Sequence, residues 1–137
     1  MKRILVCMDG SKHSEKALVY SLEEAKELGN EITALNVVRS VRYDLDETKS
    51  VVSERVKSAE DYMDGIKDKS REYGLEIDTQ VITGEDVHNE IVRYAAENNF
   101  DLIVMGGKGR SDLGTIHLGN VSESVVRRAH CPVLIVR

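Results

Sequence analysis

The sequence predicts an α/β protein: a single open sheet of five parallel strands, in the order 3-2-1-4-5, with helices on both faces. Short, continuously apolar runs alternate with longer segments whose apolar residues recur at spacings of three and four. Such runs are typical of strands buried on both faces, and the alternation is typical of strand–helix–strand crossovers. Because the 137 residues contain no linker or internal repeat, we expect one domain over residues 1–137.

In the first half of the chain, apolar runs and turn signals predict two strands and two helices. The elements are a strand over Arg3–Met8, a helix over Ser11–Leu28, a strand over Glu31–Val38 and a helix over Val51–Tyr73. The first helix has Leu18, Ser21, Leu22, Ala25 and Leu28 on one face and a C-cap at Gly29. The second has Val52, Val56, Ala59, Met63 and Ile66 aligned, and Gly74 ends it. Residues 39–49 have no clear period and are expected to form a loop.

The second half repeats the alternation. Its elements are a strand over Leu75–Thr83, a helix over Asp86–Asn98, a strand over Asp101–Gly106, a helix over Asn120–Ala129 and a strand over Pro132–Val136. The first of these strands alternates apolar and polar residues more than the others, which is typical of an edge or half-covered strand. The other two strands of this half are continuously apolar, which is typical of buried strands.

Composition and charge exclude several classes of protein. The formal charge is −5, with no Trp and one Phe, which argues against binding nucleic acid through a basic stripe or an aromatic platform. No apolar run reaches the roughly 18 residues of a membrane helix, and the N-terminus does not resemble a signal peptide. We therefore expect a cytoplasmic protein without a membrane partner.

A glycine-rich segment follows the strand predicted at Asp101–Gly106. It contains Gly106-Gly107-Lys108-Gly109 and later Gly119-Asn120-Val121-Ser122, at the start of a helix. Glycines let the backbone approach a ligand, and N–H groups at a helix N-terminus attract anions. Ligands of open parallel sheets bind beyond the carboxyl ends of the strands, where the strand order reverses. If the first and fourth strands are neighbours, Asp9 faces this segment, an arrangement that suits a nucleotide.

Other glycine-containing nucleotide-binding motifs match this segment less well. The dinucleotide pattern G-x-G-x-x-G fails because Asp112 stands at the third glycine, and there is no G-x-x-x-x-G-K-[ST] sequence. The segment His117-Leu118-Gly119-Asn120 has part of the H-x-G-H motif of nucleotidyltransferases, but it lacks the second histidine and occurs late in the chain.

The glycine spacing does match one known signature. Gly106 and Gly109 are separated by two residues, nine residues follow, and then come Gly119 and a polar residue. This spacing resembles the ATP-binding signature of the universal stress protein family. The resemblance extends over almost the whole chain, from Ile4 through Asp9-Gly10-Ser11 to the ending Ala129-His130-Cys131-Pro132-Val133-Leu134-Ile135-Val136. It implies a Rossmann-like sheet, of the flavodoxin-like or adenine nucleotide alpha hydrolase-like kind.

The resemblance also implies a nucleotide site and a dimer. Adenine would be recognised at the backbone of Val37, with Asp9 near the ribose or a Mg²⁺ or Mn²⁺ ion carried by the phosphates of ATP, ADP or AMP. The remaining implied contacts are Met8, Met105, Gly106, Lys108, Gly109, Gly119, Asn120, Val121 and Ser122. Family members dimerise through the last strand, so the resemblance implies a homodimer through residues 132–136. The alternative is a monomer whose edge strand is covered by the 39–49 loop.

The chain departs from the family pattern at two positions. Asn120 stands where the signature has Ser or Thr, and Cys7 stands where many members have proline. Asn120 and Glu123 are spaced like a capping box, so the Asn120 side chain would cap its own helix. We expect a nucleotide-dependent switch in the stress response rather than an enzyme. The alternatives are a slow ATPase, in which Asp9 positions metal and water, and an interaction protein that binds no nucleotide.

The remaining reactive side chains give no indication of a metal site, a catalytic nucleophile or a disulfide. The four histidines show no metal-ligand spacing, and no Ser–His–Asp or Cys–His arrangement is placed by a motif. Cys7 falls near the carboxyl end of the first strand and Cys131 just before the start of the last strand, too far apart in a parallel sheet for a disulfide. Lys108 and Arg110 could neutralise phosphates, although cations in exposed loops are often only solvated.

Overall fold

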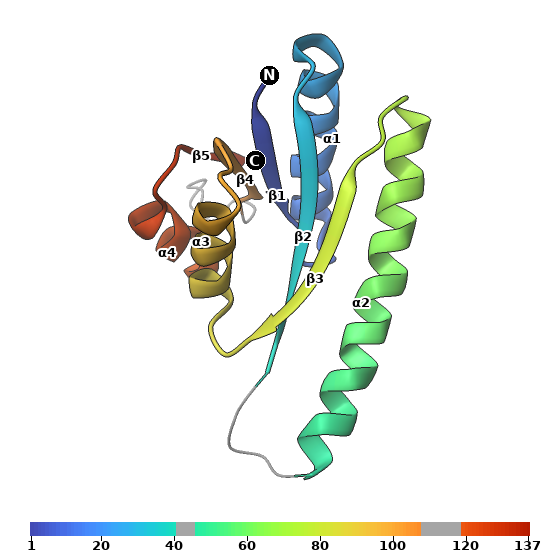
Figure 1. The fold of residues 1–137 in the computed structure, drawn as a ribbon, viewed down its shortest axis with the longest axis vertical. Coiled ribbons are helices and arrows are strands. Elements are labelled where there is room, and N and C mark those ends of the chain that lie inside the picture. The colour runs from blue at the N-terminus through green and yellow to red at the C-terminus, as the bar shows by residue number, and fades with distance from the viewer. Residues whose placement is uncertain (41–45, 108–118) are drawn as a thin grey trace, which may run out of the picture.

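Five parallel strands form one sheet in the order β3-β2-β1-β4-β5, which confirms the predicted topology (Figure 1). The computed structural model describes residues 1–40, 46–107 and 119–137, without the side chains of 46–49. The strands are β1 (Arg3–Cys7), β2 (Glu31–Arg39), β3 (Asp78–Gly84), β4 (Leu102–Gly106) and β5 (Val133–Val136). The helices are α1 (Lys12–Leu28), α2 (Asp46–Glu72), α3 (Val87–Glu97) and α4 (Asn120–Arg128).

Each face of the sheet has its own hydrophobic core. Ile4 and Val6 of β1 pack with residues of α1 and α2 on one face. Leu5, between them, packs with residues of α3 and α4 on the other face. Alternate residues of a strand point to opposite faces, so a strand covered on both sides must be apolar throughout. This explains the continuous apolar run at the start of the chain.

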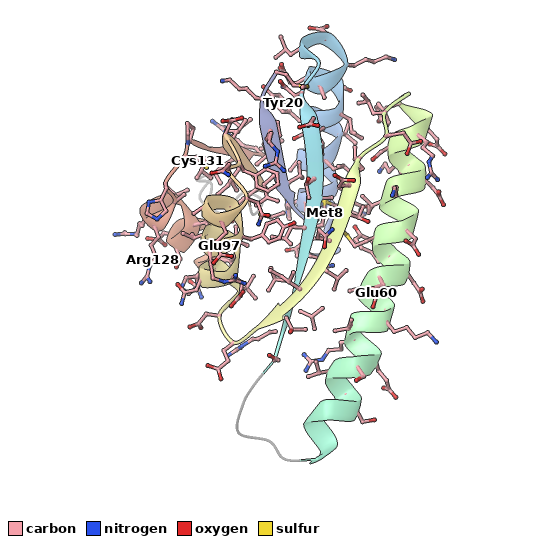
Figure 2. All side chains as sticks on the ribbon, in the orientation of Figure 1. Met8, Tyr20, Glu60, Glu97, Arg128 and Cys131 are labelled. Carbon is pink, nitrogen blue, oxygen red and sulfur yellow. The ribbon has the colours of Figure 1, made fainter. Side chains whose placement is uncertain are left out.

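Local signals position the helices against the sheet. The side chain of Ser11 caps α1 by accepting a hydrogen bond from the N–H of Ser14 at 3.2 Å. Gly29 ends the same helix with φ 71°, in the left-handed region that glycine adopts without strain. The outer faces of the helices are polar, and Glu60 of α2 and Arg128 of α4 point away from the sheet (Figure 2).

Some predicted boundaries were wrong. Helix α2 begins at Asp46, five residues before the predicted start at Val51, so the last residues of the predicted 39–49 loop are helical. This first turn is polar and carries no apolar period, which is why periodicity missed it. Strand β3 begins at Asp78 rather than Leu75, because its pairing with β2 starts only at Thr33. Leu28 is 63% exposed rather than buried, because it ends α1 beyond the core.

Strand β5 forms one edge of the sheet. It pairs in parallel with β4, and all four of its residues are half-buried. Within the described ranges, no helix is long and apolar enough to cross a lipid bilayer.

Candidate functional site

A crevice with a volume of about 450 Å³ opens at the carboxyl ends of β1 and β4. These strands are neighbours, and β2 lies on the other side of β1, so the crevice is at the point where the strand order reverses. It is lined by Cys7, Met8, Asp9, Ser11, His13, Ser14, Leu35, Val37, Val87, Ile91, Met105, Gly106, Gly107, Gly119, Asn120, Val121 and Ser122.

One wall of the crevice is apolar. It is formed by side chains from the ends of β1, β2 and β4 and from the first two turns of α3, and all of them belong to the same hydrophobic cluster. They are Cys7, Leu35, Val37, Val87, Ile91 and Met105. An apolar wall of this kind can hold a flat, weakly polar group such as a purine base.

The N-terminus of α4 supplies hydrogen-bond donors to the same crevice. Gly119 is the N-cap residue, in extended conformation, and no side chain of a described residue caps the helix. The backbone N–H groups of Asn120, Val121 and Ser122 have no acceptor within residues 1–40, 46–107 and 119–137. Unpaired N–H groups and the helix dipole favour an anion at this position.

The predicted capping box at Asn120 was wrong. Asn120 is the first helical residue, and the N-cap is its neighbour Gly119. The Glu123 carboxylate pairs with Arg127 at 2.9 Å, one helical turn further on. The Asn120 side chain is therefore exposed at the crevice instead of being engaged in capping its own helix.

Ser122 connects α4 to the end of β4. It is 8% exposed, and its hydroxyl donates a hydrogen bond of 3.4 Å to the carbonyl of Gly106. The hydroxyl thus has a partner within the protein, and the backbone N–H is the group of Ser122 that is open to a ligand.

Asp9 presents a carboxylate on the other side of the crevice. Its Oδ1 accepts a hydrogen bond of 2.9 Å from the N–H of Ser11, in a turn that Gly10 makes with φ 84°. Partial burial opposes the charge, but hydrogen bonds from Ser11 and Ser14 outweigh it and lower the pKa of Asp9 below its ordinary value. Asp9 is therefore ionised at neutral pH.

The thiol of Cys7 is kept protonated at the base of the crevice. Burial, followed by the negative charge of Asp9, raises its pKa to about 12. Cys7 and Cys131 are both free, in agreement with the expectation from the sequence.

Gly106 allows β4 to approach α1 closely. A Cβ atom at this position would overlap the carbonyl oxygen of His13 in the first turn of α1. Glycine is therefore required here by packing, whatever the crevice holds.

Most of the residues predicted for the site line this crevice. They are Met8 (labelled in Figure 2), Asp9, Val37, Met105, Gly106, Gly119, Asn120, Val121 and Ser122. Lys108 and Gly109 lie outside the described residues. The prediction missed Ser11, Ser14, Val87 and Ile91. The two serines were visible as a Ser-x-x-Ser pattern after Asp9, and the other two as an apolar pair spaced by four residues.

The described residues of the crevice do not by themselves supply a set of metal ligands. Asp9 is the one carboxylate among the described residues that line the crevice, and no group of three or more metal-ligating side chains occurs in the described part of the chain. Divalent cations need several oxygen ligands. The arrangement suits an ion whose other ligands are phosphate oxygens and water.

Comparisons with known proteins agree with this architecture. The model of the universal stress protein family matches residues 1–137. Universal stress protein MJ0531 of Methanocaldococcus jannaschii is 36% identical, over 99% of this chain and 82% of its own length. The structure of UspA from Lactobacillus plantarum has a TM-score of 0.83 and 26% identity, covering 99% of this chain and 97% of that one.

A more distant structure carries a nucleotide. It is a universal stress protein family protein from Arabidopsis thaliana with AMP bound, with a TM-score of 0.70 and 20% identity over 99% of this chain and 91% of that one. The fold, the position of the crevice and the match over the full sequence lead to one conclusion. The chain belongs to the universal stress protein family.

Proposed function

We propose that this protein binds ATP or a related adenine nucleotide in the crevice between β1 and β4 and acts as a nucleotide-dependent switch. The observation that carries the proposal is the N-terminus of α4, which has no capping side chain among the described residues and lines the same crevice of about 450 Å³ as an apolar wall. A nucleotide has the two matching parts, a flat base and an anionic phosphate chain. The AMP-bound relative with the same fold supports this choice.

In this proposal each part of the crevice takes one part of the nucleotide. The base lies against the apolar wall near Val37, whose backbone recognises adenine, and Met8, Met105 and Gly106 border the ribose. The phosphates accept hydrogen bonds from the N–H groups of Asn120, Val121 and Ser122. We further propose contacts from Lys108 and Gly109, on the basis of the family signature.

We propose that Asp9 contacts the ribose or a Mg²⁺ or Mn²⁺ ion that enters with the nucleotide. The ionised carboxylate at the rim supports this role. Release of inorganic phosphate over several hours, measured for the wild type and for Asp9→Asn, tests whether the site also hydrolyses ATP slowly.

The switch would act in a cytoplasmic stress response through the segment from Gly107 to Leu118, which lies outside the described residues except for Gly107. In this proposal a bound nucleotide orders the segment and changes the surface that a partner protein meets. We also propose a single-domain homodimer that forms through β5. Its place at the edge of the sheet and its half-buried apolar side chains support this, because an edge strand favours pairing with another strand.

The site placement is tested with Gly109→Val and a matched control, Gly65→Ala. Gly65 lies in α2, away from the crevice, and a Cβ added there contacts nothing. We expect Gly109→Val to abolish ATP binding in a calorimetric titration and to leave the thermal unfolding temperature unchanged, with Gly65→Ala binding like the wild type. Wild-type affinity in Gly109→Val would show that the site is elsewhere.

A further inference from the structure

A histidine near the start of α1, His13, also lines the crevice between β1 and β4. It is the second residue of the helix and is half-buried. Among the described residues that line the crevice, His13 is the one with a basic side chain. Its imidazole makes no hydrogen bond or ion pair with a described residue. The imidazole is therefore available to a ligand.

The backbone places His13 at the same end of β4 as the N-terminus of α4. Gly106, the last residue of β4, packs so closely on the carbonyl of His13 that a Cβ atom would overlap it. The carbonyl of the same glycine accepts the 3.4 Å hydrogen bond from the Ser122 hydroxyl. Gly106 is thus flanked by the first turns of both helices. His13 shares this end of the crevice with the donors of α4, and it is not part of the apolar wall.

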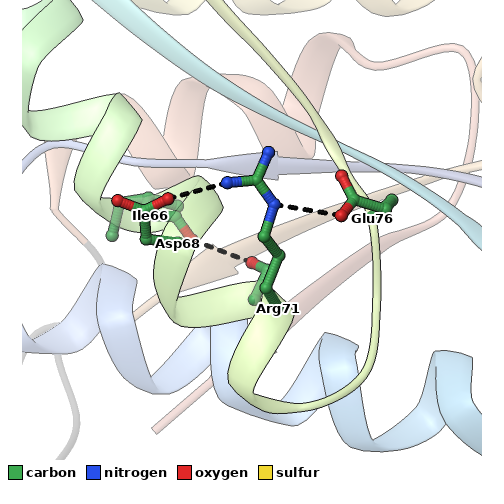
Figure 3. A network of polar contacts seen from close by, with 5 residues as sticks. Ile66, Asp68, Arg71 and Glu76 are labelled. Atoms are coloured by element: carbon green, nitrogen blue, oxygen red, sulfur yellow. Dashed lines mark hydrogen bonds and ion pairs between the residues drawn. The ribbon is translucent and has the colours of Figure 1, made fainter.

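Other cations of the described part of the chain lie outside the crevice. Lys12, the neighbour of His13 in α1, lines a separate groove on the surface. Arg71 is held between Asp68 and Glu76 near the end of α2, by hydrogen bonds of 2.8 and 3.0 Å (Figure 3). Of the described side chains, His13 is therefore the one placed to neutralise an anion in the crevice.

The N-terminus of α4 and the imidazole can serve different parts of a phosphate chain. Free N–H groups at one helix N-terminus suit one phosphate group. A nucleoside triphosphate carries two further phosphates, and their charges need donors beyond that terminus. An imidazole donates one N–H when neutral and two when protonated, and a nearby anion favours the protonated form.

We propose, on the basis of the nucleotide site proposed above, that His13 makes this site select a nucleoside triphosphate over a monophosphate. The N–H groups of Asn120, Val121 and Ser122 hold the phosphate that both ligands have. The imidazole of His13 holds a phosphate that only the triphosphate has. A monophosphate leaves the imidazole unpaired and gains no affinity from it.

Calorimetric titrations with ATP and AMP test the proposal, in buffer without Mg²⁺ so that only the protein neutralises the phosphates. We expect the wild type to bind ATP at least about tenfold more tightly than AMP. His13→Ala should weaken ATP binding about tenfold, through the loss of one charged hydrogen bond, and AMP binding less than about threefold. His13→Lys, which restores a cation, should recover part of the lost ATP affinity.

The matched control is His130→Ala, because His130 is exposed and does not line the crevice. It should bind both nucleotides like the wild type, and circular dichroism melts check that every variant is folded. Three results would overturn the role of His13 and leave the nucleotide site in place: no preference for ATP in the wild type, equal changes for ATP and AMP in His13→Ala, or no recovery in His13→Lys. Absence of binding of either nucleotide to the wild type would overturn the proposed function, and the role of His13 with it.

Discussion

Two helices, α1 and α4, begin at the same crevice, and they differ in how their N-termini are capped. At α1 the polar groups satisfy one another: Ser11 caps the helix, Asp9 accepts from the N–H of Ser11, and the Ser14 hydroxyl donates to the carbonyl of Ser11 at 2.9 Å. At α4 the N-cap is a glycine with no side chain to accept a hydrogen bond. The first N-terminus is capped by its own sequence, and the second has no capping partner among residues 1–40, 46–107 and 119–137.

This difference separates residues needed for the fold from residues proposed for binding. A cap such as Ser11 stabilises its helix, whereas Gly119 contributes less to the stability of α4 and leaves donors for an anion. The two ends should therefore respond differently to mutation: changes to the cap of α1 should alter the free energy of unfolding, and changes to the cap of α4 should alter nucleotide affinity.

The largest expected effect is that of Gly119→Asp. Aspartate at the N-cap accepts the open N–H groups and adds a negative charge, so affinity for ATP should fall about 100-fold or more. The same change should stabilise α4 by a few tenths of a kcal/mol. Calorimetry and urea unfolding measure the two effects, and Gly119→Ala is the control without a charge. Undiminished affinity in Gly119→Asp would remove α4 from the site.

Gly106→Ala should be the most destabilising substitution at the junction between β4 and α1. The added methyl group overlaps the carbonyl of His13, which cannot move without shifting α1, so we expect a loss of about 2 kcal/mol or more. Gly65→Ala, in open space within α2, should instead stabilise by about 0.5–1 kcal/mol. Urea unfolding of both variants checks this contrast, and equal stabilities would contradict it.

Ser11→Ala should lower the free energy of unfolding by about 1 kcal/mol, since α1 loses its N-cap. Affinity for ATP should change by less than about threefold, because the backbone donors assigned to the phosphates belong to α4. A large loss of affinity with unchanged stability would reverse the roles given to the two N-termini.

The smallest effect concerns the pH dependence of Asp9. Because its pKa in the folded state is lowered below the ordinary 3.8, its charge stabilises the fold above that pH, and the contribution is lost as the pH falls through the folded value. Asp9→Asn should therefore be less stable than the wild type by about 0.5–1 kcal/mol at pH 7 and equally stable near pH 2. Urea unfolding of both proteins at the two pH values measures this, and a constant difference would contradict it.

Patterns along the chain were sufficient for the fold and for the two ends of the crevice, and the family resemblance supplied most of its other residues. The apolar run before Asp9 and the run before Gly106 predicted two neighbouring buried strands, and this placed both ends of the site. The cap of α4 could not be predicted in this way. Asparagine is a preferred N-cap residue, yet the backbone places Gly119 in the extended cap conformation one residue earlier.

The start of α2 at Asp46 was beyond the reach of sequence patterns. The first turn of this helix is polar and has no apolar period, so periodicity could not distinguish it from a loop.

The central claim is that the N-terminus of α4 and the apolar wall of the same crevice form an adenine nucleotide site. The most direct test is calorimetric titration of nucleotide-stripped protein with ATP and AMP, with and without Mg²⁺. The account predicts saturable binding of one nucleotide per chain, with the affinity lost in Gly119→Asp and retained in Ser11→Ala. Absence of binding by either nucleotide up to millimolar concentration would contradict it.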